Sequence, residues 1–159
     1  YEGLVRIPLI ISWPGRFVAD HQSDALVELL DLSATLLDLA GVEMPDYFQG
    51  ASLRSILEGR DLSDAHRNFV RSEYFDALDP HFTGGTGTYA TMYRTRTHKL
   101  CVYHGKGVGE LFDLENDPWE HNDLSECPDH QIVLMNLMQK SFDAAIRATP
   151  PDAPRNMPF

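Results

Sequence analysis

The side chains of this chain that could do chemistry are its seven histidines, its two cysteines and its acidic residues. Cys101 and Cys127 are too few for a disulfide framework, so we expect two free, buried thiols, with a packing role for Cys101. No pair of histidines has a convincing zinc spacing. Asp113 and Asp117 do not follow the spacing of an EF-hand loop, and we expect them to be solvated turn residues. This pattern predicts no metal ligand.

Two histidines lie where they could line a substrate pocket. His81 belongs to a long loop at residues 76–87, and His104 stands beside a glycine. Residues 84–87 read Gly-Gly-Thr-Gly, but the Lys-Ser/Thr of a P-loop is missing and no helix follows, so we expect no phosphate cradle. Long loops are often functional. We therefore expect residues 79–89 to form a rim of the pocket, with His81 and His104 as substrate-binding residues; the alternative is that both are ordinary surface histidines.

The composition limits the class of protein. With 159 residues, 43% of them hydrophobic, the chain could form one ordinary domain, or one small domain and part of another. No apolar stretch approaches the length of a membrane span. The formal net charge of −11 disfavours nucleic acid and anionic lipid as partners, because binding to phosphates needs a positive field.

The first third of the chain predicts elements of an α/β domain. Residues 7–13 form a nearly continuous apolar run, which is typical of a strand that is covered on both faces in a parallel sheet. No similar run lies nearby, so we expect the other strands of that sheet to be missing from this chain. Asp31 can cap a helix over residues 32–40, and Gly41 supplies a left-handed stop. Residues 52–57 predict a further short helix.

The remainder predicts a small antiparallel sheet. Residues 68–75 read as a strand, residues 88–94 and 99–103 pair as a hairpin, and residues 111–114 add a strand. Mixed polar and aromatic faces favour a sheet with one face in water. The last strand belongs to residues 109–120, which end in a sharp turn on Asn-Asp-Pro, and we expect the acids there to be solvated.

A long amphipathic helix is predicted over residues 128–147, followed by a proline-rich tail from residue 150. The apolar residues at helical spacing are expected to face the core. They are Ile132, Met135, Leu137, Met138, Phe142, Ala145 and Ile146.

Four stretches, taken in order, carry a family resemblance. They are Tyr1-Glu2-Gly3-Leu4-Val5-Arg6-Ile7-Pro8-Leu9-Ile10-Ile11, Asp31-Leu32-Ser33-Ala34-Thr35-Leu36-Leu37-Asp38-Leu39-Ala40-Gly41, Met92-Tyr93-Arg94-Thr95-Arg96-Thr97-His98-Lys99-Leu100 and Gly109-Glu110-Leu111-Phe112-Asp113-Leu114-Glu115-Asn116-Asp117-Pro118-Trp119-Glu120. In this order they resemble the C-terminal third of a type I sulfatase, of the alkaline-phosphatase-like superfamily. The resemblance runs from Tyr1 to about Leu124. Ala34 stands where the family commonly has proline, and Leu4 where it often has glycine.

The resemblance implies that the catalytic groups lie upstream of this chain. In the family the nucleophile is a formylglycine made from a Cys/Ser-x-Pro-x-Arg motif. Neither cysteine fits, since Cys101 is followed by Val-Tyr-His and Cys127 by Pro-Asp-His. The carboxylate ligands of the family's calcium also precede Tyr1. We therefore assign no catalytic and no metal-binding residue here, and expect this segment alone to be inactive.

The predicted fold is an α/β fragment plus an α+β part. Residues 1–62 would supply the last strand and helix of an alkaline-phosphatase-like catalytic domain. Residues 63–159 would form a C-terminal subdomain in which an antiparallel sheet packs on the long helix, followed by the tail. The expected partners are a sulfate ester and the protein's own N-terminal catalytic domain, and self-association is left open. The alternatives are a phosphonate or phosphate ester hydrolase of the same superfamily, and a non-catalytic interaction module.

Overall fold

The computed structural model describes residues 1–76 and 87–148, which fall into two compact units. Unit 1 combines Tyr1–Ile11 with Arg67–Met138, and unit 2 combines Ser12–His66 with the chain from Gln139 onward. Each unit is described by itself.

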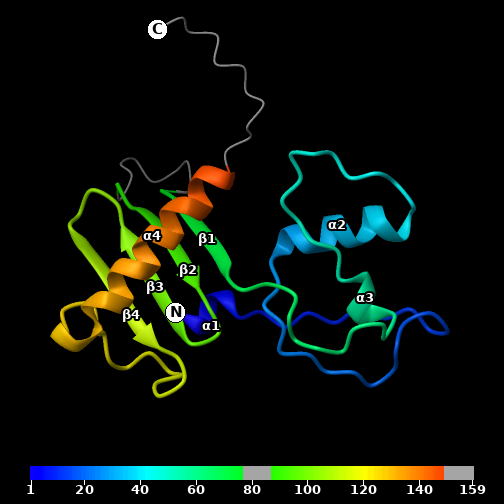
Figure 1. Ribbon diagram of the computed structural model, residues 1–159, viewed down its shortest axis with the longest axis horizontal. Helices are drawn as coiled ribbons and strands as arrows, with labels where there is room; N and C mark the ends of the chain where they lie inside the picture. Colours follow the sequence, from blue (N-terminus) through cyan, green and yellow to red (C-terminus); the bar gives the residue numbers. More distant parts are fainter. Residues whose placement is uncertain (77–86, 149–159) are drawn as a thin grey trace, which may run out of the picture. The chain divides into compact units, whose positions relative to one another are not determined.

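Unit 1 is built on a four-stranded antiparallel sheet, as the sequence predicts (Figure 1). Its strands are β1 (Val70–Phe75), β2 (Tyr89–Arg94), β3 (His98–Tyr103) and β4 (Val108–Asp113), in the spatial order β1-β2-β3-β4. The tight turn between β2 and β3 is closed by the N–H of Thr95, which donates to the carbonyl oxygen of His98 at 2.8 Å. The predicted hairpin is confirmed, and β4 begins earlier than residue 111.

Both faces of this sheet contain buried residues, so the expectation of one face in water is wrong. Leu100 pairs with Leu111 across β3 and β4, and both are buried. The next pair, Lys99 with Phe112, points to the opposite face because side chains alternate along a strand, and it is buried as well. The ring of Tyr1 lies 6.0 Å from the ring of Phe112. The N-terminal segment therefore covers the second face.

Helix α4 (Gln131–Ala148) follows a short 3-10 turn at Pro128–His130, which confirms the predicted helix. The part of α4 through Met138 belongs to unit 1, and in Figure 1 this part lies over the sheet. Its predicted core stripe is largely wrong. Only Leu137 of that stripe is buried, together with Ala144, whereas the other large residues are exposed because they lie on a different side of the helix. The exposed residues are Ile132, Met135, Phe142 and Ile146, with Met138 partly exposed.

The predicted strand over residues 7–13 does not form in this chain. A one-turn helix, α1 (Glu2–Val5), comes first, and residues 6–13 lie in no helix or strand. The side chains of Ile7 and Ile10 are 60% and 90% exposed. A strand needs neighbours to satisfy its backbone groups, and no strand of the described residues pairs with this one.

Unit 2 contains α2 (Leu29–Leu39) and α3 (Arg54–Leu57), which the side chain of Thr35 links by accepting a hydrogen bond from the N–H of Leu53 at 2.9 Å. Gly50 lies against α2 so closely that a Cβ atom there would be 2.3 Å from the carbonyl oxygen of Leu30. Gly41 has φ +70°, as expected for a left-handed stop.

Asp31 does not cap α2 as predicted, because the helix begins at Leu29, three residues earlier than that cap requires. The N-cap is Glu28, and Asp31 forms the third position of a capping box with it. Asp31 is fully buried, and its carboxylate accepts hydrogen bonds from the N–H groups of Glu28 (2.9 Å) and Ala51 (2.8 Å). The ring of His66 also lies 3.1 Å from one of its oxygens. One carboxylate therefore joins the start of α2 to two distant segments.

We predict that Asp31→Ala destabilises the protein by about 3 kcal/mol, because it leaves buried donors without an acceptor. Asp46→Ala, at an exposed loop aspartate of the same unit, should change the free energy of unfolding by less than about 0.5 kcal/mol. Denaturant unfolding monitored by circular dichroism measures both. Equal effects of the two substitutions would contradict this role of Asp31.

Candidate functional site

Unit 1 contains a cluster of four buried or half-buried charged residues, which we call the Lys99 cluster: Glu2, Arg94, Lys99 and Glu120. Lys99 is 0% exposed. Its ammonium nitrogen lies 3.2 Å from Oε1 of Glu2 and contacts the carboxylate of Glu120. The Nε atom of Arg94 lies 2.9 Å from the same oxygen of Glu2. Two cations and two carboxylates therefore meet inside the unit.

Strand register places the two cations of the Lys99 cluster. Arg94 in β2 and Lys99 in β3 are Cα partners, so their side chains point to the same face of the sheet. Glu2 comes from α1, which covers that face. Both cations therefore come from strands of the sheet, and α1 places the carboxylate of Glu2 beside them.

The turn after β4 delivers Glu120. The N–H of Asp117 donates to the carbonyl oxygen of Asp113 at 2.8 Å, and Glu120 itself has φ +59°, a left-handed conformation that is uncommon for a residue other than glycine. In this position the Glu120 carboxylate also accepts a hydrogen bond from the backbone N–H of Glu2 at 2.6 Å. The sequence-based expectation that this acid is solvated is wrong.

The electrostatic surroundings of Glu2 favour its charged form. Burial by itself would raise the pKa of Glu2, but the hydrogen bonds and charges of Arg94 and Lys99 outweigh it, and the pKa of Glu2 lies below its usual range. Glu2 is therefore ionised in the folded protein at neutral pH. A carboxylate buried beside two cations suits a fixed structural joint, and it leaves neither cation free to bind an anion.

A second polar group lies on the same face of the sheet. The carboxylate of Glu110 accepts a hydrogen bond from the hydroxyl of Tyr1 at 2.9 Å and from that of Tyr103 at 2.8 Å. The bond to Glu110 raises the pKa of Tyr103, so this phenol stays protonated and remains a donor. Cys101 pairs with Glu110 across the strands, and burial raises the pKa of its thiol, which disfavours a reactive thiolate.

The structure describes only one of the two predicted substrate-binding histidines, His104. His104 is exposed beyond the end of β3, and its Nε2 atom lies 3.0 Å from the hydroxyl oxygen of Thr91. His81 and most of the predicted rim at residues 79–89 lie outside the described residues. The role of both histidines therefore stays a prediction.

The described residues do not fit a metal ion, because residues 1–76 and 87–148 contain no group of three or more potential ligands. Asp113 is the last residue of β4 and Asp117 lies in the turn that follows, and both side chains are partly exposed. Asn116 donates to Asp113, and the N–H of Asn122 donates to Asp117 at 2.7 Å. These hydrogen bonds hold the pKa of each carboxyl below its usual range. Both cysteines are free, as predicted, but each is only partly buried.

The sequence analysis missed Glu2, Lys99 and Glu120 as interacting residues, whereas a salt bridge is the ordinary expectation for Arg94 and is formed with Glu2. One signal was available: Glu2, Arg94 with Lys99, and Glu120 belong to three of the four stretches that carry the family resemblance. The left-handed conformation of Glu120 has no signature in the sequence.

Comparison with known proteins identifies the family of the chain. The family described as N-sulphoglucosamine sulphohydrolase, C-terminal, matches residues 1–146. The chain belongs to this sulfatase family. An N-acetylglucosamine-6-O-sulfatase from Bacteroides thetaiotaomicron is 33% identical over 148 residues, which make up 89% of this chain and 25% of the relative. The sulfatase chain described here thus spans only a quarter of that relative's length.

Two solved structures of larger proteins contain the same fold. One, in complex with its substrate D-glucosamine-2-N,6-O-disulfate, has a TM-score of 0.75 and 27% identity, covering 93% of this chain and 30% of the other. The second, the phosphonate monoester hydrolase of Silicibacter pomeroyi, has a TM-score of 0.71 and 25% identity, covering 87% and 28%. Among the described residues, no helix has the length and apolar character needed to cross a membrane.

We predict that Lys99→Met destabilises the protein by about 3–5 kcal/mol, because it leaves Glu2 and Glu120 buried without their shared cation. Lys140→Met, at an exposed lysine of α4, should cost less than about 0.5 kcal/mol. Denaturant unfolding gives both values.

A double-mutant cycle separates charge from packing in this test. Glu120→Gln should recover part of the stability that Lys99→Met loses, because it removes one uncompensated carboxylate. If the two substitutions were simply additive, the ion pair would not be the cause of the loss.

Proposed function

We propose that this chain is the C-terminal part of a sulfatase that hydrolyses sulfate esters. The observation that carries the proposal is the match of the sulfatase C-terminal family to residues 1–146. The substrate-bound solved structure, which shares the fold over 93% of the chain, supports it.

In this proposal the chain supports the catalytic domain and borders its substrate cleft. Residues 1–62 complete the catalytic domain, where residues 7–13 join a parallel sheet of the longer protein. The exposure of Ile7 and Ile10 supports this assignment, because both are large apolar side chains without cover in the described residues. Residues 63–159 form the C-terminal subdomain, which the Lys99 cluster ties to the N-terminal segment.

The nucleophile and the metal of the proposed enzyme lie outside this chain. A formylglycine would require a motif that surrounds neither Cys101 nor Cys127. A calcium site would require a set of carboxylates that the described residues do not supply. The isolated segment is therefore expected to turn over no ester, and we derive no catalytic step for it.

A phosphonate ester hydrolase is the second candidate. It is favoured by the likeness to the Silicibacter pomeroyi enzyme, which has a TM-score of 0.71. The sulfatase proposal ranks first because the family match concerns sulphohydrolases and the N-acetylglucosamine-6-O-sulfatase is the more similar in sequence, at 33% identity.

The test of the proposal is an activity assay on the full-length protein that contains this chain. We predict that it hydrolyses an aryl sulfate or a sulfated glucosamine with a higher kcat/KM than the corresponding phosphonate monoester. The segment 1–159 alone serves as the inactive control. A preference for the phosphonate would favour the second candidate, and no turnover of either ester would favour a non-catalytic interaction module.

We predict that His104→Ala in the full-length protein raises KM for the sulfate ester about fivefold with little change in kcat, as expected for the loss of one ground-state hydrogen bond. The matched control is His121→Ala, at another exposed histidine of unit 1. Unchanged kinetics for His104→Ala would remove this residue from the substrate site and leave the sulfatase assignment intact.

A further inference from the structure

The first two residues of the chain are attached to the rest of unit 1 through carboxylates. The hydroxyl of Tyr1 donates a hydrogen bond to Glu110 at 2.9 Å, and the backbone N–H of Glu2 donates one to Glu120 at 2.6 Å. The carboxylate of Glu2 in turn pairs with the two cations of the Lys99 cluster. Each of these attachments has a carboxylate on one side, so a proton can change each of them.

Apolar contacts add little to the attachment of α1 to the sheet. None of the residues of α1 is buried, and next to it the ring of Tyr1 lies 6.0 Å from the ring of Phe112. A helix of a single turn is not stable by itself in water. On the side that faces the sheet, α1 therefore depends on the carboxylate attachments, whatever covers its outer side in the longer protein.

The sheet itself is held together without carboxylates. Its four strands pair through backbone hydrogen bonds, and Leu100 and Leu111 are buried between β3 and β4. Backbone amides and leucine side chains do not titrate between neutral and mildly acidic pH. Acid should therefore act on the attachment of α1 before it acts on the sheet.

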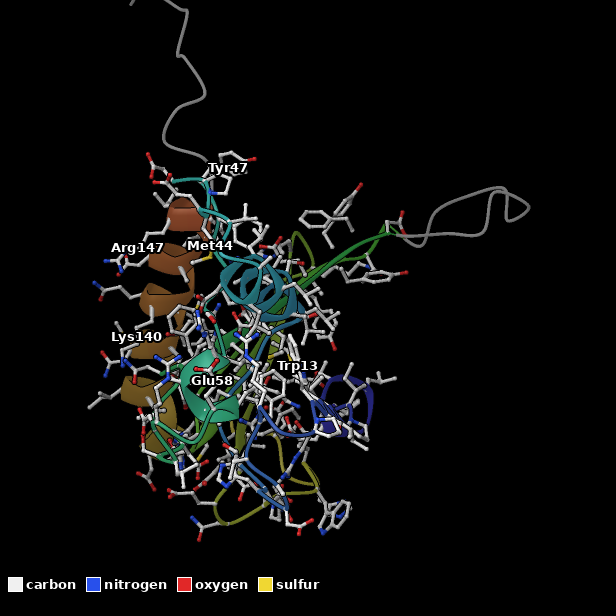
Figure 2. The ribbon with its side chains drawn as sticks, turned by 90° about the vertical axis from the view of Figure 1, so that its right-hand side faces the viewer. Trp13, Met44, Tyr47, Glu58, Lys140 and Arg147 are labelled. Carbon is white, nitrogen blue, oxygen red and sulfur yellow. The ribbon has the colours of Figure 1, made fainter. Side chains whose placement is uncertain are left out.

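Lys99 keeps its positive charge in acid, whereas its partners lose their negative charges. Lysine is ordinarily a surface residue, and Figure 2 shows Lys140 on the outside of α4, but Lys99 is 0% exposed. A buried cation that loses its carboxylate partner is strongly destabilising. Movement of α1 away from the sheet would return Lys99 to water. The buried ammonium group therefore favours the open arrangement once Glu2 is neutral.

The charged groups around Glu2 fix the direction of the pH dependence. It is faced by Arg94 from β2, Lys99 from β3 and Glu120 from the turn after β4. Burial raises the pKa of Glu2, but the hydrogen bonds and charges of Arg94 and Lys99 outweigh it and hold the pKa below the usual 4.5. A carboxylate of this kind contributes stability above its usual pKa, and the contribution is lost as the pH falls through its lower folded value. The attachment is therefore complete at neutral pH and weakens below about pH 4.5.

We propose that the contact between residues 1–5 and the sheet is an acid-sensitive joint. In acid the joint opens, so that α1 leaves the sheet and Lys99 becomes hydrated while the four-stranded sheet stays folded. The joint lies within unit 1 and does not depend on sulfatase activity, so this proposal and the proposed function can fail separately.

The experiment measures hydrogen exchange in the full-length protein from about pH 7 to about pH 3. Rates are expressed as protection factors, which correct for the effect of pH on the chemical exchange rate. The N–H groups of Leu4 and Arg6 report on the joint, because they donate to the carbonyl oxygens of Tyr1 and Glu2 only while α1 is formed. Their protection should fall at least about tenfold in acid, whereas that of β2 and β3 should change less than about twofold.

A variant reproduces the open joint at neutral pH. Glu2→Gln removes the charge that acid would neutralise, so at pH 7 the protection of Leu4 and Arg6 should already be at least about tenfold lower than in the wild type. Acid should then lower it little further. Glu115→Gln, at an exposed glutamate of unit 1, is the matched control and should behave like the wild type. Circular dichroism checks that each variant is folded.

Three results would overturn the proposal. The first is a wild type in which α1 keeps its protection in acid. The second is a loss of protection by α1 and the sheet at the same pH, which would mean that the unit unfolds as a whole. The third is a folded Glu2→Gln variant in which α1 stays protected at pH 7. If Glu2→Gln does not fold, the pH series of the wild type decides by itself.

Discussion

The ion pairs of Lys99 are the constraint on which unit 1 depends. A lysine that is 0% exposed is stable only if carboxylates compensate its lost hydration, and Glu2 and Glu120 do so from two segments that are far apart in the sequence. Neither carboxylate belongs to the sheet. The start of the chain and the turn after β4 must therefore both close on β3 before the lysine can be buried. The buried charge of Lys99 therefore specifies which segments meet, because it needs carboxylate partners. Apolar contacts alone would accept several arrangements.

Unit 2 also contains a buried charged group whose partners come from other segments, but there the charge is negative. There a buried carboxylate, Asp31, is the fixed group, and backbone N–H groups of Glu28 and Ala51 come to it. Each of the four stretches that carry the sulfatase resemblance supplies a member of one of these two clusters. Each stretch thus contributes a side chain that holds parts of the chain far apart in the sequence together.

The sequence predicted the helices and strands that depend on residues close together in the chain. Alternation in β2 and β3 with a tight turn was enough for the hairpin, and helical spacing was enough for α4, because both depend on residues a few positions apart. Which face of α4 turns inward could not be predicted, since two apolar rows compete and only the tertiary structure selects Leu137. The strand at residues 7–13 failed for the same reason: its pairing partners are not in the described chain. Glu120 was missed because its burial depends on a left-handed backbone conformation and on Lys99, which is 21 residues earlier in the sequence.

The described part of the chain buries several charged side chains and exposes several large apolar ones. Lys99, Asp31 and Glu120 are inside, whereas Ile10 and Ile132 are 90% and 75% exposed. For a self-sufficient domain this would be unfavourable, since roughly 25 cal/mol is lost for each Å² of apolar surface left in water. It is reasonable for a segment that spans a quarter of the length of its sulfatase relatives. Such a segment needs internal fixed points that hold its shape, which the ion clusters provide. It also needs apolar surface left over for assembly, such as residues 7–13 toward the proposed catalytic sheet.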